Sequence, residues 1–358
     1  MSEKIFALVM AGGRGTRFWP ESTSTRPKQY LKLFSNNSLL KETLLRFASM
    51  ILPAQRYIVT VKEQEIMAQT EANLEIGKNN LIIEPAGRNT APCILLSIAS
   101  LIKNGAEKDD LIVIVPADHV ILNTSGFLET LNGACDLIRV KDTLVTIGIP
   151  PTFPHTGYGY IQKGEEFLKG VYNVLKFREK PNFETAKEYL KTGNYLWNAG
   201  IFVGRIGRFL EEFKKHAPEI YCFYGALQEN ISSFKKTSDI YNQIPKNSID
   251  FAVMEKSDCV SVIPARFDLN DLGSWDALEG VVEKKNHNTF AAIKDAYVSN
   301  SSGNIVFAPN KFATLIDVND LIIVSNEKNI MVISKEKAQK VKDVVEYLEG
   351  HYLKNELL

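Results

Sequence analysis

The sequence predicts an α/β fold in which a mixed, mostly parallel sheet is flanked by helices and followed by a small β-rich module with a closing helix. Two observations lead to this prediction. Over the first 150 residues, short apolar runs rich in β-branched residues alternate with amphipathic stretches, which is the pattern of βαβ units. From about residue 286, short strand candidates recur between polar turns, which indicates a separate β-rich unit.

The first half of the chain supplies the alternation of strands and helices. Buried strands are predicted at 5–10, 57–61, 81–83, 111–115 and 144–147. Helical spacing of apolar residues predicts helices between them, at 39–50, 63–75, 91–101 and 126–139. Ligands of such sheets bind beyond the carboxyl ends of the strands. The motifs that follow these strands are therefore expected to form the functional site.

The second half of the chain is more mixed. It contains strand candidates at 159–162, 171–176 and 200–203 and helix candidates at 182–191 and 206–216. Near the end, strands are predicted at 305–307, 313–316, 321–325 and 330–333, and a closing helix at 335–352. We expect two domains, a large one at 1–285 and a small one at 286–358.

The composition is that of an ordinary soluble globular protein, with 45% apolar and 23% charged residues and a formal net charge of zero. A neutral chain gives no reason to expect nucleic acid or a membrane surface as a partner. The opening apolar run of six residues is too short for a signal sequence or a membrane span, so the cytoplasm is expected. The cysteines are scattered singly, which argues against a zinc site or a disulfide framework; they are Cys93, Cys135, Cys222 and Cys259.

A glycine-rich loop follows the first predicted strand, with the sequence Ala11-Gly12-Gly13-Arg14-Gly15-Thr16-Arg17. Glycines let backbone N–H groups approach an anion closely, and arginines add forked donors suited to phosphate. The alternative is a flexible connection with solvated basic residues. The dinucleotide-binding pattern GxGxxG fails, because Phe18 stands where its third glycine belongs, and the Walker pattern is absent. A dehydrogenase is therefore disfavoured.

This loop resembles the signature of the sugar-nucleotide pyrophosphorylases, over Leu8 to Pro20 and again at Pro27-Lys28-Gln29. The ending Phe18-Trp19-Pro20, Gln29 and the segment 84–92 resemble the mannose-1-phosphate guanylyltransferase branch. The resemblance covers roughly residues 4–285 and, more loosely, the tail. It implies a Rossmann-like, glycosyltransferase-A-like nucleotidyltransferase domain and a β-helix-like C-terminal module. The chain departs from the family at one point. The family usually has Ser-Arg directly after Trp-Pro-x, where this chain has Ser22-Thr23. The arginine stands instead at Arg26, and because its position does not match the family's, we assign it no catalytic role.

The resemblance also implies roles on the nucleotide side. The loop residues Ala11, Gly12, Gly13, Arg14, Gly15 and Thr16 would wrap the triphosphate. Arg17 and Lys28 would neutralise charge at the transferring phosphorus, and Asn89 and Thr90 would contact the nucleotide. The alternative for Asn89 and Thr90 is that they only cap a helix.

Two aspartates are candidate metal ligands. Asp118 follows the strand at 111–115, and Asp271 lies in the acidic run 268–276. Each is by itself compatible with a turn or cap residue. A carboxylate beside a triphosphate needs an intervening cation, and Mg²⁺ uses few protein ligands because it keeps waters and phosphate oxygens. The resemblance implies that Asp118 and Asp271 together hold Mg²⁺.

The middle of the chain carries candidate sugar-binding residues. Gly157 precedes a run of aromatics, Glu179 can accept hydroxyls beside the cation of Lys180, and the amide of Asn198 can both donate and accept. Each motif alone is also compatible with a surface turn or a core residue. In their order along the chain they resemble the family's sugar-binding half, and Ser248 to Lys256 resembles a structural helix beside it.

The expected reaction joins GTP and mannose-1-phosphate to give GDP-mannose and pyrophosphate. No Ser-His-Asp or Cys-His arrangement is apparent, so a covalent intermediate is not expected. Lys180 would orient the attacking phosphate. The alternatives are another pair, such as UTP or ATP with glucose-1-phosphate, and a catalytically silent sugar-nucleotide sensor. The resemblance further implies that the C-terminal module can serve a homodimer, and the isomerase domain of longer members is not expected here.

Overall fold

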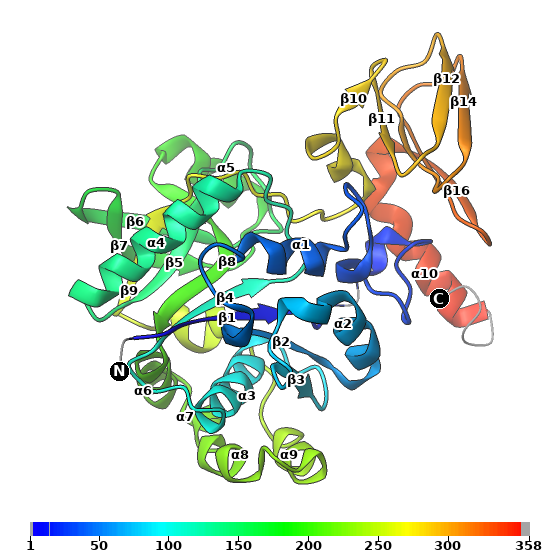
Figure 1. The fold of residues 1–358 in the computed structure, drawn as a ribbon. Coiled ribbons are helices and arrows are strands. Elements are labelled where there is room, and N and C mark those ends of the chain that lie inside the picture. Colours follow the sequence, from blue (N-terminus) through cyan, green and yellow to red (C-terminus); the bar gives the residue numbers. More distant parts are fainter. Residues whose placement is uncertain (1–2, 14, 352–358) are drawn as a thin grey trace.

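The structure is a computed structural model that describes residues 3–13 and 15–351. A large domain is built around one nine-stranded sheet, and a smaller β module lies beside it (Figure 1). The strands of the large sheet are β1 (Ile5–Met10), β2 (Arg56–Val61), β3 (Leu81–Glu84), β4 (Leu111–Pro116), β5 (Leu144–Ile149), β6 (Tyr160–Leu168), β7 (Val171–Arg178), β8 (Tyr195–Arg205) and β9 (Val260–Pro264).

The large sheet is mixed and mostly parallel, as the sequence predicts. Its order is β3-β2-β1-β4-β8-β5-β9-β7-β6, and in the described chain every strand of it except β7 and β8 runs in one direction. The reversed strand β8 lies between β4 and β5. Because it is antiparallel to β4, its first residues lie at the edge where β4 ends. That edge is where ligands of open α/β sheets bind.

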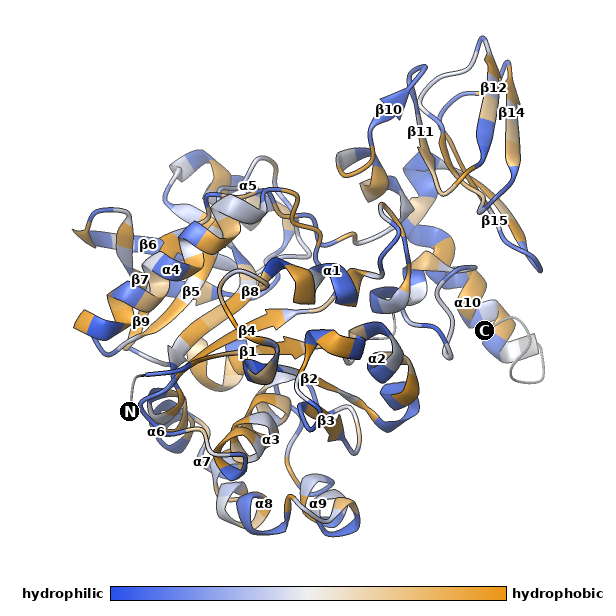
Figure 2. Cartoon of the chain, viewed as in Figure 1, coloured by the Kyte–Doolittle hydropathy of each residue, from blue (hydrophilic) through white to orange (hydrophobic). Residues whose placement is uncertain are grey.

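Helices cover both faces of the sheet because successive strand residues point to opposite sides. In β1, Phe6 and Leu8 belong to one core and Ala7 and Val9 to the other. The strands between these layers are the most hydrophobic part of the ribbon (Figure 2). The first core is covered by α3 (Thr90–Lys103), α6 (Ile206–His216), α7 (Pro218–Tyr221), α8 (Tyr224–Asn230) and α9 (Phe234–Tyr241). The second is covered by α1 (Leu39–Arg46), α2 (Glu65–Ala72), α4 (Thr124–Val140) and α5 (Phe183–Thr192).

The C-terminal module is a short β-helix. Three parallel strands stack in register, with Thr289 opposite Ile305 and Ile305 opposite Ile322, and two more parallel strands form a second wall. At one corner, the side chain of Asn304 donates to Asn288 Oδ1 at 2.9 Å, a ladder that satisfies buried polar groups between coils. The elements are β10 (Lys284–Lys285), β11 (Asn288–Ala291), β12 (Asp295–Ser299), β13 (Ile305–Phe307), β14 (Phe312–Ile316), β15 (Leu321–Ser325), β16 (Ile330–Ser334) and α10 (Val341–His351).

Several boundaries differ from the sequence predictions. The closing helix begins with a 3-10 turn, Lys335–Lys340, before α10, and its predicted last residue, Tyr352, lies outside the described residues. The helix expected around 248–256 is a five-residue π turn, Asp250–Met254. β10, which ends at the last residue of the large domain predicted at 1–285, pairs with β11 of the module. Among the residues described, no helix is long and apolar enough to cross a membrane.

Candidate active site

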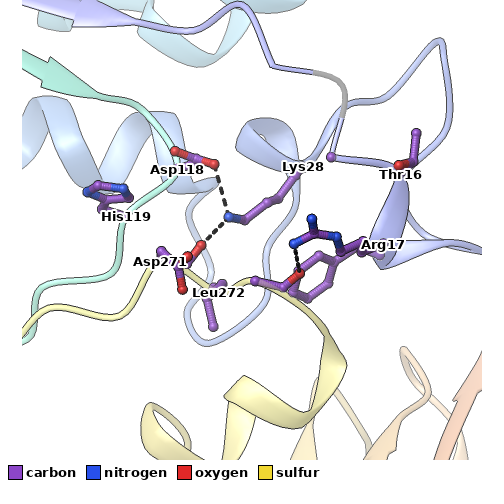
Figure 3. Close-up of a pocket in the computed structure, with 10 residues that line it drawn as sticks. Thr16, Arg17, Lys28, Asp118, His119, Asp271 and Leu272 are labelled. Carbon is purple, nitrogen blue, oxygen red and sulfur yellow. Dashed lines mark hydrogen bonds and ion pairs between the residues drawn. The ribbon is translucent and has the colours of Figure 1, made fainter. Parts of the chain in front are cut away.

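A cavity of about 330 Å³ lies beyond the carboxyl ends of β1 and β4, between the glycine-rich loop and the segment that follows β9. Several side chains of opposite charge converge on it (Figure 3). Its lining consists of Gly15, Thr16, Arg17, Phe18, Lys28, Asp118, His119, Asp271, Leu272 and Gly273. Of the predicted site residues, the structure therefore brings together Gly15, Thr16, Arg17, Lys28, Asp118 and Asp271.

The shape of the glycine-rich loop depends on one glycine and one glutamine. Gly15 has φ +62°, and a Cβ built there would lie 2.3 Å from the Cβ of Lys28. Only glycine therefore lets the loop pass over Lys28. The buried amide of Gln29 donates to the carbonyl oxygens of Ala11 and Gly13, each at 3.0 Å. Gln29 therefore holds the shape of the loop, a role that the sequence analysis did not give it, and Arg14 lies outside the described residues.

Two cations beside the glycine-rich loop, Arg17 and Lys28, reach across the cavity to Asp118 and to the segment that follows β9. Arg17 donates to the backbone oxygen of Gly273 at 3.4 Å. The nearly buried Lys28 ammonium donates to Asp118 Oδ2 at 3.0 Å and to the backbone oxygen of Asp271. Forked and point-charge donors at the mouth of a glycine-rich loop are suited to binding phosphate groups.

The two aspartates predicted as metal ligands lie on opposite sides of the Lys28 ammonium (Figure 3). Burial tends to raise the pKa of Asp118, but the charges of Lys28 and His119 together hold it below its usual value. Asp118 therefore stays ionised near neutral pH. Burial, and then the charge of Asp271, raise the pKa of the Tyr158 hydroxyl. Tyr158 belongs to the run of aromatics that the sequence analysis placed on the sugar side.

The oxygen atoms around Lys28 fit a hard divalent cation. They already surround one positive charge, and carboxylate oxygens are the ligands that Mg²⁺ prefers. Within 3–13 and 15–351, no group of three or more His, Cys, Asp or Glu side chains is arranged to hold a metal. Asp118 and Asp271 would therefore leave most coordination positions to water and to substrate phosphate, which is the usual arrangement for Mg²⁺.

A second polar cluster lies at the start of β8. Asn198 donates to Asp250 Oδ1 at 3.0 Å and accepts at Oδ1 from Thr146 and from the backbone N–H of Gly200. A Cβ on Gly159 would lie 2.6 Å from Glu179 Oε2 and 3.3 Å from the Cβ of Asn198. Gly159 therefore permits these two predicted sugar-binding residues to approach each other.

The other predicted sugar-side residues are placed differently. Lys180 forms an ion pair with Glu179 at 2.8 Å and its side chain is 62% exposed, so it is free to reach a ligand. The N–H of Gly157 donates to His155 Nδ1 at 3.0 Å. The cluster is completed by Asp250 from the π turn, a segment for which the sequence analysis expected only a structural role.

Asn89 and Thr90 begin α3 and are not among the residues that line the cavity. Asn89 caps the helix, accepting from the N–H of Thr90 at 2.8 Å, and Thr90 Oγ1 accepts from the N–H of Ile249 at 2.8 Å. Between them and the glycine-rich loop lies the buried Glu84, whose Oε1 accepts from Tyr241 and from the N–H of Arg88. Its Oε2 is 3.7 Å from the position of a Cβ on Gly12.

The titration of Asp250 gives a testable pH dependence. Burial, and then the charge of Glu179, raise the pKa of Asp250 from 3.8 to about 6. A carboxyl whose pKa is raised in the folded state stabilises the fold when protonated. We therefore expect the free energy of unfolding to fall as the pH rises from about 4 to about 6, and this slope to shrink in Asp250→Asn.

Urea denaturation at a series of pH values measures this slope. Asp258→Asn, a change at an exposed aspartate, serves as the control and keeps the wild-type slope. An unchanged slope in Asp250→Asn would show that other groups carry the pH dependence.

Comparison with known proteins identifies the family of this chain. A family model described as nucleotidyl transferase matches residues 6–288, and one described as a mannose-phosphate isomerase/GMP-like β-helix domain matches residues 297–348. A mannose-1-phosphate guanylyltransferase from Salmonella muenchen is 34% identical over 97% of this chain and 74% of its own length. Mannose-1-phosphate guanylyltransferase 2 from Escherichia coli O157:H7 is 36% identical, over 96% and 73%.

A solved structure is similar over almost the whole chain. It is described as mannose-1-phosphate geranyltransferase from Thermus thermophilus, with a TM-score of 0.87 and 34% identity over 97% of this chain and 99% of that one. Nucleotidyl transferases generally use a divalent metal ion. The matched sequence, the fold and the charged cavity beyond β1 and β4 establish that the chain belongs to the nucleotidyl transferase family, in the group of the mannose-1-phosphate guanylyltransferases.

Proposed function

We propose that this chain transfers the guanylyl group of GTP to mannose-1-phosphate, giving GDP-mannose and pyrophosphate. The observation that carries the proposal is the convergence of Arg17, Lys28, Asp118 and Asp271 on one cavity at the end of a glycine-rich loop. The names of the similar proteins support guanine and mannose as the substrate groups.

The proposed reaction is an in-line displacement at phosphorus. A phosphate oxygen of mannose-1-phosphate attacks the α-phosphorus of GTP, and the bond from that phosphorus to the bridging oxygen of pyrophosphate breaks. The attacking oxygen is already ionised near neutral pH, so no general base is needed. Phosphoryl transfer depends mainly on positioning and charge neutralisation. Arg17 and Lys28 stabilise the leaving pyrophosphate, and Lys180 orients the attacking phosphate.

We propose Mg²⁺ as the metal ion, held by Asp118 and Asp271. When bound, it neutralises charge on the phosphate oxygens and lets the two anionic substrates approach. The chain's own part is to keep Asp118 ionised and to supply Lys28 to the triphosphate. The phosphates offer the Lys28 ammonium stronger acceptors than the single carboxylate oxygen it contacts in this structure.

The remaining assignments complete the proposal. Backbone groups of Ala11, Gly12, Gly13 and Gly15, with Arg14 and Thr16, bind the phosphates; Asn89 and Thr90 lie along the nucleoside. Gly157, Glu179 and Asn198 bind the hydroxyl groups of mannose. We further propose that the nucleotidyltransferase domain ends near residue 285, and that the module at 286–358 serves a homodimer.

Pyrophosphate release by the purified protein tests the proposal. The assay crosses GTP, UTP, ATP and CTP with mannose-, glucose- and N-acetylglucosamine-1-phosphate in the presence of Mg²⁺. We expect the pair of GTP and mannose-1-phosphate to dominate. A dominant signal from another pair would keep the mechanism and replace the substrates, and silence from folded protein with every pair would indicate a sensor.

A further inference from the structure

The cavity has two walls that come from distant parts of the chain. The first wall is Gly15 to Phe18, which continues into Trp19 and Pro20, and the second is Asp271 to Gly273, which continues into Ser274 and Trp275. Direct contacts join them, since Trp275 Nε1 donates to the backbone oxygen of Trp19 at 3.0 Å. The rings of Phe18 and Trp275 also pack at a centroid distance of 4.9 Å.

The C-terminal module contacts both walls from behind. Asn326 Nδ2 donates to the backbone oxygen of Pro20 at 3.1 Å, and Gln339 Nε2 donates to Ser274 Oγ at 2.8 Å. The Phe307 ring of β13 lies 5.2 Å from the Trp275 ring. In Figure 1, α10 runs beside the segment that follows β1. The two walls and the module share one apolar core, which includes Phe18, Trp19, Leu272, Trp275, Ile305, Phe307, Val324 and Val341.

The second wall contains a strained backbone position. Leu272, between Asp271 and Gly273, has φ +43°, a left-handed conformation that costs free energy for a residue other than glycine. Such a conformation persists only where the surroundings enforce it. The Leu272 side chain is 0% exposed and belongs to the shared core. The core therefore holds the backbone that turns Asp271 toward Lys28.

We infer that the C-terminal module is a positioning element of the reaction cavity, acting through Phe307 and Trp275 on the strained segment at Leu272. Phe307 touches no substrate in this arrangement and acts through Trp275, so it is a positioning residue. The inference rests on the proposed function only for its kinetic readout.

The test compares two substitutions to alanine, each of which shortens a buried side chain of the module. Phe307→Ala removes the ring behind Trp275. Leu315→Ala is the matched control, because Leu315 is equally buried, at 3% exposed, but belongs to a second core made up of residues of the module. Both variants are expected to lower the thermal stability through the cavities they create.

The two variants are expected to differ in turnover and in the hydrogen exchange of the cavity wall. A small displacement of a positioned group lowers turnover by about 10- to 100-fold, so Phe307→Ala is expected to lose that much kcat, with KM for GTP within about twofold of wild type. Amide hydrogen exchange of peptides covering 268–276 is expected to accelerate in Phe307→Ala. Leu315→Ala is expected to keep the wild-type kcat and exchange.

Two results would overturn the inference. One is faster unfolding of Phe307→Ala with wild-type kcat and unchanged exchange at 268–276, and the other is an equal loss of kcat in Leu315→Ala. The hydrogen exchange needs no substrate. It therefore decides the inference even if the wild-type protein does not use GTP and mannose-1-phosphate.

Discussion

Replacing Lys28 by alanine is expected to lower kcat for pyrophosphate release about 10²–10³-fold, which is the usual cost of losing one charge stabiliser in a closed site. The ammonium is nearly buried and lies between Asp118 and the backbone of Asp271. Beside a triphosphate, the same charge would face the leaving pyrophosphate. The loss is expected in kcat more than in KM, because charge develops on the leaving group in the transition state.

Two further variants separate charge from packing. The ammonium of Lys28 lies 5.8 Å from the centre of the Phe18 ring, and its Cβ meets the loop at Gly15. Lys28→Met keeps most of this aliphatic contact and removes the charge, so it is expected to be as inactive as Lys28→Ala while melting closer to wild type. Lys32→Ala removes an exposed cation in the same segment and is expected to be neutral. Substantial activity in Lys28→Met would contradict the proposed role.

Asp118→Asn is expected to lower kcat by a similar factor, about 10²–10³-fold, because the amide keeps the shape of the side chain but loses the charge that holds a divalent ion. The same substitution is expected to raise the Mg²⁺ concentration needed for half-maximal activity. EDTA is expected to abolish wild-type activity, and Mg²⁺ added back is expected to restore it. Each effect is measured by pyrophosphate release in a magnesium titration.

The control for Asp118→Asn is Asp109→Asn, which removes an exposed carboxylate just before β4. This control is expected to keep wild-type turnover and wild-type dependence on Mg²⁺. Wild-type magnesium dependence in Asp118→Asn would remove Asp118 from the metal site and leave Asp271 as the remaining candidate.

Local patterns were sufficient to predict the first half of the fold, but not β9, which lies inside the large sheet, nor α7, α8 and α9. Apolar periodicity located the strands of the first half and the helices between them, because burial on one or two faces imposes a period of about two or 3.6 residues. It was less accurate at the ends of helices. The helix predicted at 39–50 ends at Arg46, where turns follow, and the segment beside the sugar cluster folds as a π turn rather than as a regular helix.

The sequence by itself determined where the glycine-rich loop and the motifs at the strand ends lie, and it predicted that they carry the chemistry. The loop at 11–17 must be glycine-rich to bring backbone donors to an anion, and the residues at the carboxyl ends of parallel strands must share one edge. These constraints act within a few neighbouring residues, so they can be recognised in a short sequence motif. The family resemblance added the roles of Lys28, Asp118 and Asp271.

Tertiary structure alone decided how these segments meet. Lys28 is 90 positions from Asp118 and 243 from Asp271, yet it contacts both. No local pattern encodes these contacts in space, because they depend on where the end of β4 and the segment after β9 lie relative to Lys28. The left-handed conformation of Leu272 and its burial against the C-terminal module are of the same kind. A leucine has no intrinsic preference for that conformation, so its surroundings must hold it: the packing of the shared core and the hydrogen bond from the Leu272 N–H to Asn270 Oδ1 at 2.8 Å.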